Sequence, residues 1–142
     1  MSLPPKLQEI VDDFASMSRE EKLETLIGYA ESLPPLPERL KEERAKMEAV
    51  PECMTPVCLF AEKQADDRII FHFDIPPQSP TVRGLAAILA SGLNGTTLKE
   101  ILSVPADFFF PMKLDEAVSQ QRLNGFMGVL AHMKQAAVKL GT

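Results

Sequence analysis

The chain has 142 residues, of which 45% are hydrophobic and 25% charged, and its formal net charge is −5. This composition is close to the globular average, which excludes wholesale disorder, and the acidic balance argues against nucleic acid or an anionic membrane surface as a partner. Because one domain commonly spans about 100–200 residues, we expect residues 1–142 to form a single domain.

The start of the chain and its two cysteines bear on where the protein works. The opening segment MSLPP resembles neither a signal peptide nor an Arg-rich transit peptide, and no apolar run approaches a membrane span. Two cysteines in a chain of this length do not make a secreted disulfide framework. We therefore predict a cytoplasmic protein whose thiols stay reduced.

Helices are predicted for the first part of the chain. Residues 7–14 carry a short apolar stripe that indicates a helical turn or two. Ser18 and Glu21 have the spacing of a capping box, and an apolar face follows until two prolines at 34–35 end the helix. The charged segment 36–50 predicts a solvated helix or an ordered loop, with a short edge strand near its end.

Two alternating segments in the middle of the chain predict an antiparallel hairpin. Apolar side chains at 57, 59 and 61 share one face of the first strand, and residues 68–75 alternate in the same way after a turn at 65–67. Two strands alone are marginally stable, so a third strand or covering helices are needed.

Helix signals fill the rest of the chain. Predicted helices occupy 79–95, with Ser79 as N-cap, then 97–105, opened by a capping box of Thr97 and Glu100, and 119–141. Gly84, inside the first of these, indicates close packing against another backbone, since glycine in a helix costs about 1 kcal/mol. Because helices and strands do not alternate as βαβ units, the predicted class is α+β, with a small antiparallel sheet of about three strands packed against helices.

Few residues are candidates for chemistry. Glycine patterns of nucleotide sites are absent, and two cysteines and two histidines far apart do not suit a zinc site, so we expect neither cofactor nor metal. The remaining candidate is Cys53, because Pro51 and Pro56 fix the backbone of its loop. The alternative is a small buried apolar residue, which we favour for Cys58 within its strand. A disulfide between the two cysteines is a further alternative.

Four segments carry a resemblance to the SufE family of cysteine desulfuration proteins, which share a fold with the NifU-like cluster scaffolds. The segments are 33–37 (LPPLP), 50–57 (VPECMTPV), 80–85 (PTVRGL) and 119–126 (SQQRLNGF). In this order and spacing they extend the resemblance over most of the chain, from Lys6 to Leu140. Many members have glycine where this chain has Glu52, serine at the position of Thr55, and an aromatic residue at the position of Cys58.

The resemblance implies an accessory sulfur-transfer protein that activates a cysteine desulfurase and is not itself an enzyme. A SufS-like desulfurase, which uses pyridoxal phosphate, would pass persulfide sulfur to Cys53 for delivery to a cluster scaffold complex. Arg122, Arg83 and Thr55 are the candidates for supporting Cys53. The protein would act as a monomer or a homodimer. Two alternatives stay open, a NifU-like cluster scaffold and a non-catalytic binding module.

No sequence neighbour of Cys53 would activate it. Attack on a persulfide requires a thiolate. At the reference pKa of about 8.5, roughly 3% of a cysteine is ionised at about pH 7. The carboxylate of Glu52 would raise the pKa of Cys53 if it pointed inward. We therefore expect Cys53 to be sheltered in the free protein and to react within the partner's site.

Overall fold

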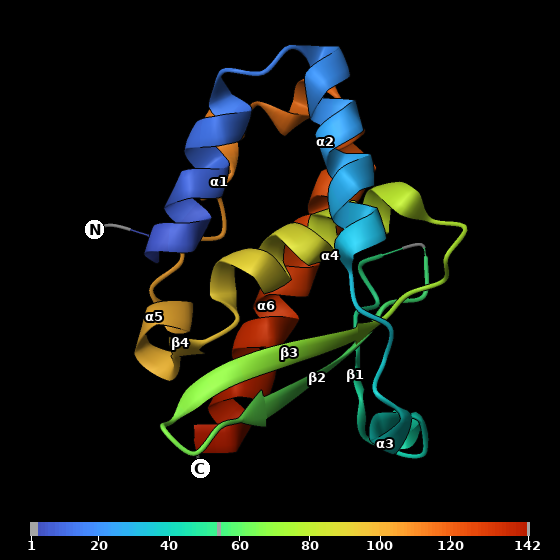
Figure 1. Ribbon diagram of the computed structural model, residues 1–142, viewed down its shortest axis with the longest axis vertical. Helices are drawn as coiled ribbons and strands as arrows, with labels where there is room; N and C mark the ends of the chain where they lie inside the picture. Colours follow the sequence, from blue (N-terminus) through green and yellow to red (C-terminus); the bar gives the residue numbers. More distant parts are fainter. Residues whose placement is uncertain (1–2, 54, 142) are drawn as a thin grey trace.

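The computed structural model describes residues 3–53 and 55–141, and it confirms the predicted α+β class. Helices from both ends of the chain pack together with a small sheet formed from its middle (Figure 1). The elements in chain order are α1 (Pro5–Ala15), α2 (Arg19–Ser32), α3 (Glu38–Lys41), η1 (Arg44–Lys46), β1 (Glu48–Ala49), β2 (Cys58–Lys63), β3 (Arg68–Asp74), α4 (Pro80–Leu93), β4 (Thr96–Thr97), α5 (Leu98–Leu102), η2 (Phe110–Met112), η3 (Leu114–Glu116) and α6 (Gln120–Gly141), where η marks a 3-10 helix.

The sheet is antiparallel with the order β1-β2-β3-β4. The predicted hairpin is its centre, where β2 and β3 pair from Cys58 opposite Asp74 to Lys63 opposite Ile69. The short edge strand predicted near residue 50 is β1. The sheet has four strands where about three were predicted, because β4 is only two residues long and such a short bridge leaves no alternating pattern in the sequence.

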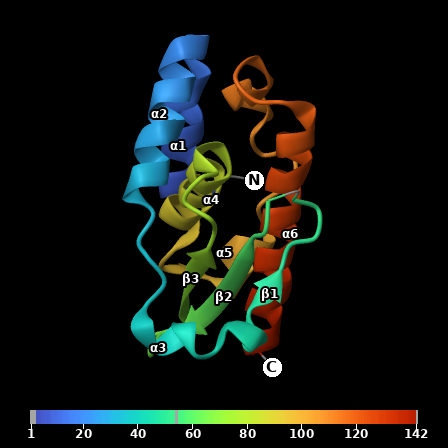
Figure 2. The same ribbon diagram turned by 90° about the vertical axis from the view of Figure 1, so that its right-hand side faces the viewer.

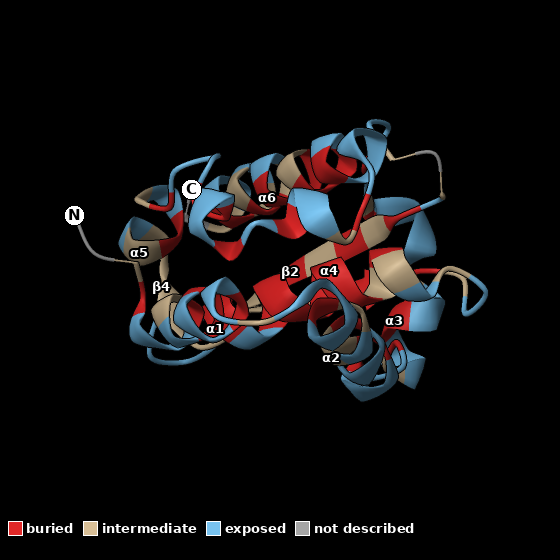
Figure 3. Cartoon of the chain, turned by 90° about the horizontal axis from the view of Figure 1, so that it is seen from above, coloured by how far each residue is buried: buried red, intermediate tan, exposed pale blue. Residues whose placement is uncertain are grey.

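The helices pack on the sheet and on one another in layers. Helix α4 contacts α1 and α2 on one side and α6 and β3 on the other, while α6 also lies against β2. Figure 2 shows α1 and α2 on one side of the molecule and α6 on the other, with α4 and the sheet between them. Ten of the fourteen residues of α4 are buried, which is why much of this helix is red in Figure 3. No helix in the described part of the chain is long and apolar enough to cross a membrane.

Most local predictions for the first helices hold. Helix α1 buries the predicted apolar stripe, and the capping box of Ser18 and Glu21 starts α2. The predicted apolar face of α2 is wrong in one turn, since Ile27 is 50% exposed and Lys22 is fully buried. The Lys22 ammonium group donates to the Lys113 carbonyl and pairs with a carboxylate, so the buried charge is compensated.

Gly84 explains how closely α4 approaches α2. A methyl group at this position would overlap the backbone carbonyl of Leu26. The predicted backbone-to-backbone contact at Gly84 is therefore confirmed. It brings the start of α4 into the wall of the cavity beneath the cysteine loop.

Candidate functional site

The connection between β1 and β2 holds Cys53 at its turn. The Val50 N–H donates to the Val57 carbonyl (3.0 Å), which extends the pairing of the two strands into the base of the loop. The Cys53 N–H donates back to the Val50 carbonyl (3.2 Å), closing a tight turn that Pro51 stiffens. Local hydrogen bonds therefore hold the backbone on the N-terminal side of the thiol.

The loop lies on α6, where two glycines make room for it. The Cys53 thiol donates to the Gly125 carbonyl, with Sγ 3.6 Å from the oxygen. A Cβ at Gly125 would lie 2.9 Å from Cys53 Sγ, and one at Gly128 would lie 2.8 Å from Glu52 Cβ. Because any side chain at these positions would collide with the loop, the two glycines are what permits Cys53 and Glu52 to sit against the helix.

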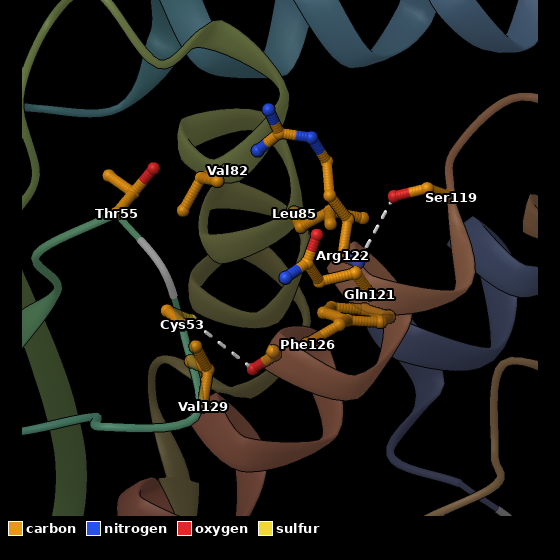
Figure 4. A pocket seen from close by; sticks show the side chains of 10 residues that line it. Cys53, Thr55, Val82, Leu85, Ser119, Gln121, Arg122, Phe126 and Val129 are labelled. Carbon is orange, nitrogen blue, oxygen red and sulfur yellow. Dashed lines mark hydrogen bonds between the residues drawn. The ribbon is translucent and has the colours of Figure 1, made fainter.

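Beneath the thiol is a cavity of about 300 Å³. Figure 4 shows the side chains around it, which come from the loop, from α4 and from the first turns of α6. Its lining combines apolar and polar groups: Cys53, Thr55, Val82, Leu85, Ser119, Gln121, Arg122, Gly125, Phe126 and Val129. The cavity thus offers a thiol a wall in which apolar and polar groups contribute about equally, with the cation of Arg122 among them.

The surroundings of Cys53 favour the protonated thiol. Burial raises its pKa above the ordinary value, the charge of Glu52 raises it further, and the charge of Arg122 lowers it. Burial and Glu52 together outweigh Arg122, so the pKa is raised overall. The half-buried thiol therefore favours its protonated form, and the charge of Glu52 acts in the direction that the sequence predicted.

The three predicted supporting residues have different surroundings. Arg122 and Thr55 both line the cavity with Cys53. The Thr55 hydroxyl lies 3.3 Å from the hydroxyl of Ser79. Ser79 is the N-cap residue of α4 as predicted, but its side chain makes no cap hydrogen bond to the helix. Arg83 points elsewhere and donates to the Ile75 carbonyl (2.9 Å).

The second cysteine lies in a different environment. Cys58 opens β2, is partly buried, and packs against a small apolar cluster of Leu36, Leu40 and Met47. Burial raises the pKa of its thiol, and the charge of Asp74 raises it further. Both cysteines are free thiols, and the packing of Cys58 agrees with its interpretation as a small apolar residue.

One residue at the site escaped the sequence interpretation. His132 contacts both Glu48 and Glu52, yet the sequence showed it only as one histidine on a long helix. Its spacing from Gly125 and Gly128, seven and four residues, is the signal that was available, since such residues share one face of a helix. Among the described residues, no three or more His, Cys, Asp or Glu side chains form a group suited to a metal ion.

Comparisons with known proteins agree on one family. The family model "SufE: Fe-S metabolism associated domain" matches residues 8–137. An uncharacterised SufE-like protein of Mycobacterium tuberculosis is 41% identical over 134 residues, which are 94% of this chain and 92% of the relative. The protein named "Cysteine desulfuration protein SufE" of Plasmodium vivax is 26% identical over 137 residues, 93% of this chain and 52% of that protein.

A solved structure matches the fold. The solution structure of a hypothetical protein from Thermus thermophilus superimposes with a TM-score of 0.87 at 30% identity, covering 99% of this chain and all of that one. "SufE-like protein 1, chloroplastic/mitochondrial" of Arabidopsis thaliana is 34% identical over 139 residues, which are 97% of this chain and 36% of that protein. The similarity therefore extends along almost the whole chain.

Proposed function

Because this chain belongs to the SufE family, we propose that it accepts sulfur from a cysteine desulfurase on Cys53 and carries it to iron–sulfur cluster assembly. The observation that supports this proposal best is the placing of Cys53, a free thiol at the turn of a stiff loop over a cavity. The name "cysteine desulfuration protein" borne by the Plasmodium relatives points to the same role.

The transfer step is a thiol–persulfide exchange. The Cys53 thiol loses its proton, and the thiolate attacks the outer sulfur of the persulfide on the desulfurase cysteine. A new sulfur–sulfur bond forms at Cys53 as the old one breaks, and the desulfurase cysteine leaves as a thiolate that takes up a proton. No external oxidant or reductant enters the step, since one persulfide replaces another.

The residues around Cys53 have separable roles in this step. Arg122 lowers the pKa of Cys53 and would also stabilise the negative charge of a Cys53 persulfide. Thr55 fixes the far side of the loop through the Ser79 hydroxyl. Since burial raises the thiol pKa, Cys53 gains reactivity on leaving the cavity for the partner's site.

The transfer would involve a partner enzyme, a sulfur acceptor and a reducing compartment. The partner is a SufS-like desulfurase, which supplies pyridoxal phosphate, so this chain needs no cofactor of its own. A cluster scaffold complex receives the sulfur, and a reducing compartment such as the cytoplasm keeps Cys53 available. The protein acts as an activator, because removing the persulfide frees the desulfurase for another turnover.

The test is desulfurase turnover with the wild-type protein, Cys53→Ser and Cys58→Ser. We expect the wild type and Cys58→Ser to accelerate the release of alanine from cysteine, and Cys53→Ser to leave the desulfurase at its basal rate. Equal stimulation by Cys53→Ser would refute the carrier role. An iron–sulfur cluster that reconstitutes on this chain alone would favour the scaffold alternative.

A further inference from the structure

His132 lies between two carboxylates from different segments of the chain. Its Nδ1 atom is 2.6 Å from Glu48 Oε2, and its Nε2 atom is 3.1 Å from Glu52 Oε1. Glu48 belongs to β1, Glu52 to the cysteine loop and His132 to α6. The imidazole therefore joins the strand, the loop and the helix at one point, through a glutamate that directly precedes Cys53.

The two carboxylates on opposite ring nitrogens suit an imidazole that donates from both. A neutral imidazole has one N–H donor, so one of its nitrogens would face a carboxylate lone pair with a lone pair of its own. The imidazolium donates from both nitrogens and satisfies both carboxylates. Lys139 also pairs with Glu48 (3.1 Å), so a lysine cation lies beside the carboxylate that His132 contacts.

Two of the three side chains in this contact are largely buried, which distinguishes it from an ion pair on the surface. The side chains of Glu48 and His132 are 12% and 16% exposed, whereas Glu52 is 44% exposed. Burial raises the pKa of the Glu48 carboxyl, but hydrogen bonds from His132 and Lys139 outweigh it and leave the pKa lowered. The contact of the imidazole with Glu48 is thus sheltered from solvent. The contact with Glu52 is partly exposed and is the one that can break.

Holding Glu52 also holds Cys53. The two residues are adjacent, and both pack on α6 where glycines leave room, Glu52 at Gly128 and Cys53 at Gly125. The Cys53 thiol makes a weak hydrogen bond to the Gly125 carbonyl. The contact of the Glu52 carboxylate with His132 is stronger than this bond when the ring is charged.

We propose that His132 is a positioning residue that holds the Cys53 loop on α6 through Glu52, and that release of this contact lets the thiol leave its cavity. The destination of the released thiol, the persulfide of a desulfurase, rests on the proposed function. The holding contact itself does not, since it is a property of the free protein. A glycine in place of Glu52 could not make this contact. The holding contact is therefore possible only in chains that have both the glutamate and the histidine.

The proposal predicts a rise in thiol accessibility that depends on pH. Loss of one partly exposed, charge-assisted contact should raise the population of the released loop about fivefold, equivalent to about 1 kcal/mol. The charged groups that face His132 are Glu48 from β1, Glu52 from the loop and Lys139 along α6 through Glu48. An imidazolium ring can donate to both carboxylates and a neutral ring to only one, so the contact should hold the loop best in the acid part of the range.

The experiment measures alkylation of Cys53 by iodoacetamide in a Cys58→Ser background, between about pH 6 and about pH 9, where histidine and cysteine ordinarily titrate. Each rate is divided by the thiolate fraction, taken from the ultraviolet absorbance of the thiolate. The variants are His132→Phe, which removes both donors, and His132→Arg, which keeps a cation with several donors at every pH. His72→Phe is the matched control, because His72 pairs with Glu62 (2.7 Å) on the sheet.

We expect His132→Phe to alkylate about fivefold faster than wild type at the acid end of the range, with the ratio falling towards one at the alkaline end. His132→Arg should react as slowly as wild type at low pH and stay slow at high pH. Glu52→Gln should reproduce His132→Phe, and the double variant should add nothing to either. His72→Phe should leave the rate unchanged.

Two results would overturn the proposal. One is a thiolate-corrected rate for His132→Phe or Glu52→Gln within twofold of wild type across the range. The other is an acceleration that is independent of pH and equal in His72→Phe, which would indicate general destabilisation. Glu52→Gln changes only a partly exposed carboxyl, so it tests the contact even if a change at His132 impairs folding.

These measurements use no desulfurase, which separates the proposal from the proposed function. Rates that follow the expected pattern in a protein that never gains sulfur would support the holding contact and refute the carrier role. Sulfur gain at Cys53 with unchanged alkylation rates would refute the contact and leave the carrier role intact.

Discussion

Gly125→Ala tests most directly whether the thiol is seated against α6. The added Cβ would lie 2.9 Å from Cys53 Sγ but 3.6 Å from Cys53 Cα. Since ordinary contacts between such atoms are about 3.5–4.0 Å, the loop backbone fits and only the sulfur is too close. The thiol can escape by rotating about one side-chain bond, so we expect the helix to stay in place and the sulfur to leave the cavity.

The magnitude follows from two opposing effects. Alanine in a helix interior is favoured over glycine by about 1 kcal/mol. The half-buried thiol loses some of its contacts and a weak hydrogen bond, which offsets part of this gain. We therefore expect a melting temperature from unchanged to about 3 °C higher, given about 2–4 °C per kcal/mol for a domain of this size.

The assay combines thermal unfolding with alkylation of Cys53 in the Cys58→Ser background. Gly125→Ala should raise the alkylation rate at least about fivefold, the factor that corresponds to about 1 kcal/mol. Gly28→Ala is the control, since a Cβ there meets nothing within 4 Å and the thiol should not respond. A melting temperature several degrees lower with an unchanged alkylation rate would mean that the helix yields and the thiol stays, which refutes the reasoning.

Three further predictions concern packing and charge. Gly84→Ala should lower the free energy of unfolding by about 2 kcal/mol, because the methyl group meets a backbone carbonyl, whereas Gly28→Ala should raise it by about 0.5–1 kcal/mol; urea unfolding measures both. Arg122→Gln should raise the pKa of Cys53 further and slow its alkylation near neutral pH; a pKa that stays the same or falls would contradict the charge assignment. The pKa of Glu62 is lowered from 4.5 to about 2, mainly by the hydrogen bond from a neighbouring arginine, so the wild type should be more stable than Glu62→Gln at neutral pH, and this advantage should vanish as pH falls from about 4.5 to about 2; unfolding curves of both proteins at several pH values would show it.

Local signals in the sequence predicted the elements well. Some signals depend only on residues that are close in the sequence, namely the capping boxes at Ser18 and Thr97 and the alternation along β2 and β3. The structure contains all of them. The two-residue strand β4 falls below the length at which alternation is visible, whereas the predicted short edge strand near residue 50 is present as β1. Lys22 was missed for a different reason, since its carbonyl and carboxylate partners lie about ninety residues away in the chain.

At the site, too, the sequence predicted local features but not contacts between distant segments. Flanking prolines in the sequence pointed to Cys53 as the reactive candidate, and the neighbouring Glu52 predicted the direction of its pKa. The contact between this loop and α6 depends on how β2 packs against α6. No local sequence pattern predicts that packing. Gly125, Gly128 and His132 therefore gained their meaning only from the structure, where each contacts the loop.

The most direct measurement of the sulfur-carrier role is a single-turnover transfer followed by mass spectrometry. A desulfurase charged with one persulfide and freed of excess cysteine is mixed with this protein, and the intact mass and cysteine peptides are then measured. We predict the gain of one reducible sulfur atom on Cys53, retained in Cys58→Ser and absent in Cys53→Ser. Sulfur on Cys58, or no gain of mass while the desulfurase persulfide persists, would contradict transfer to Cys53.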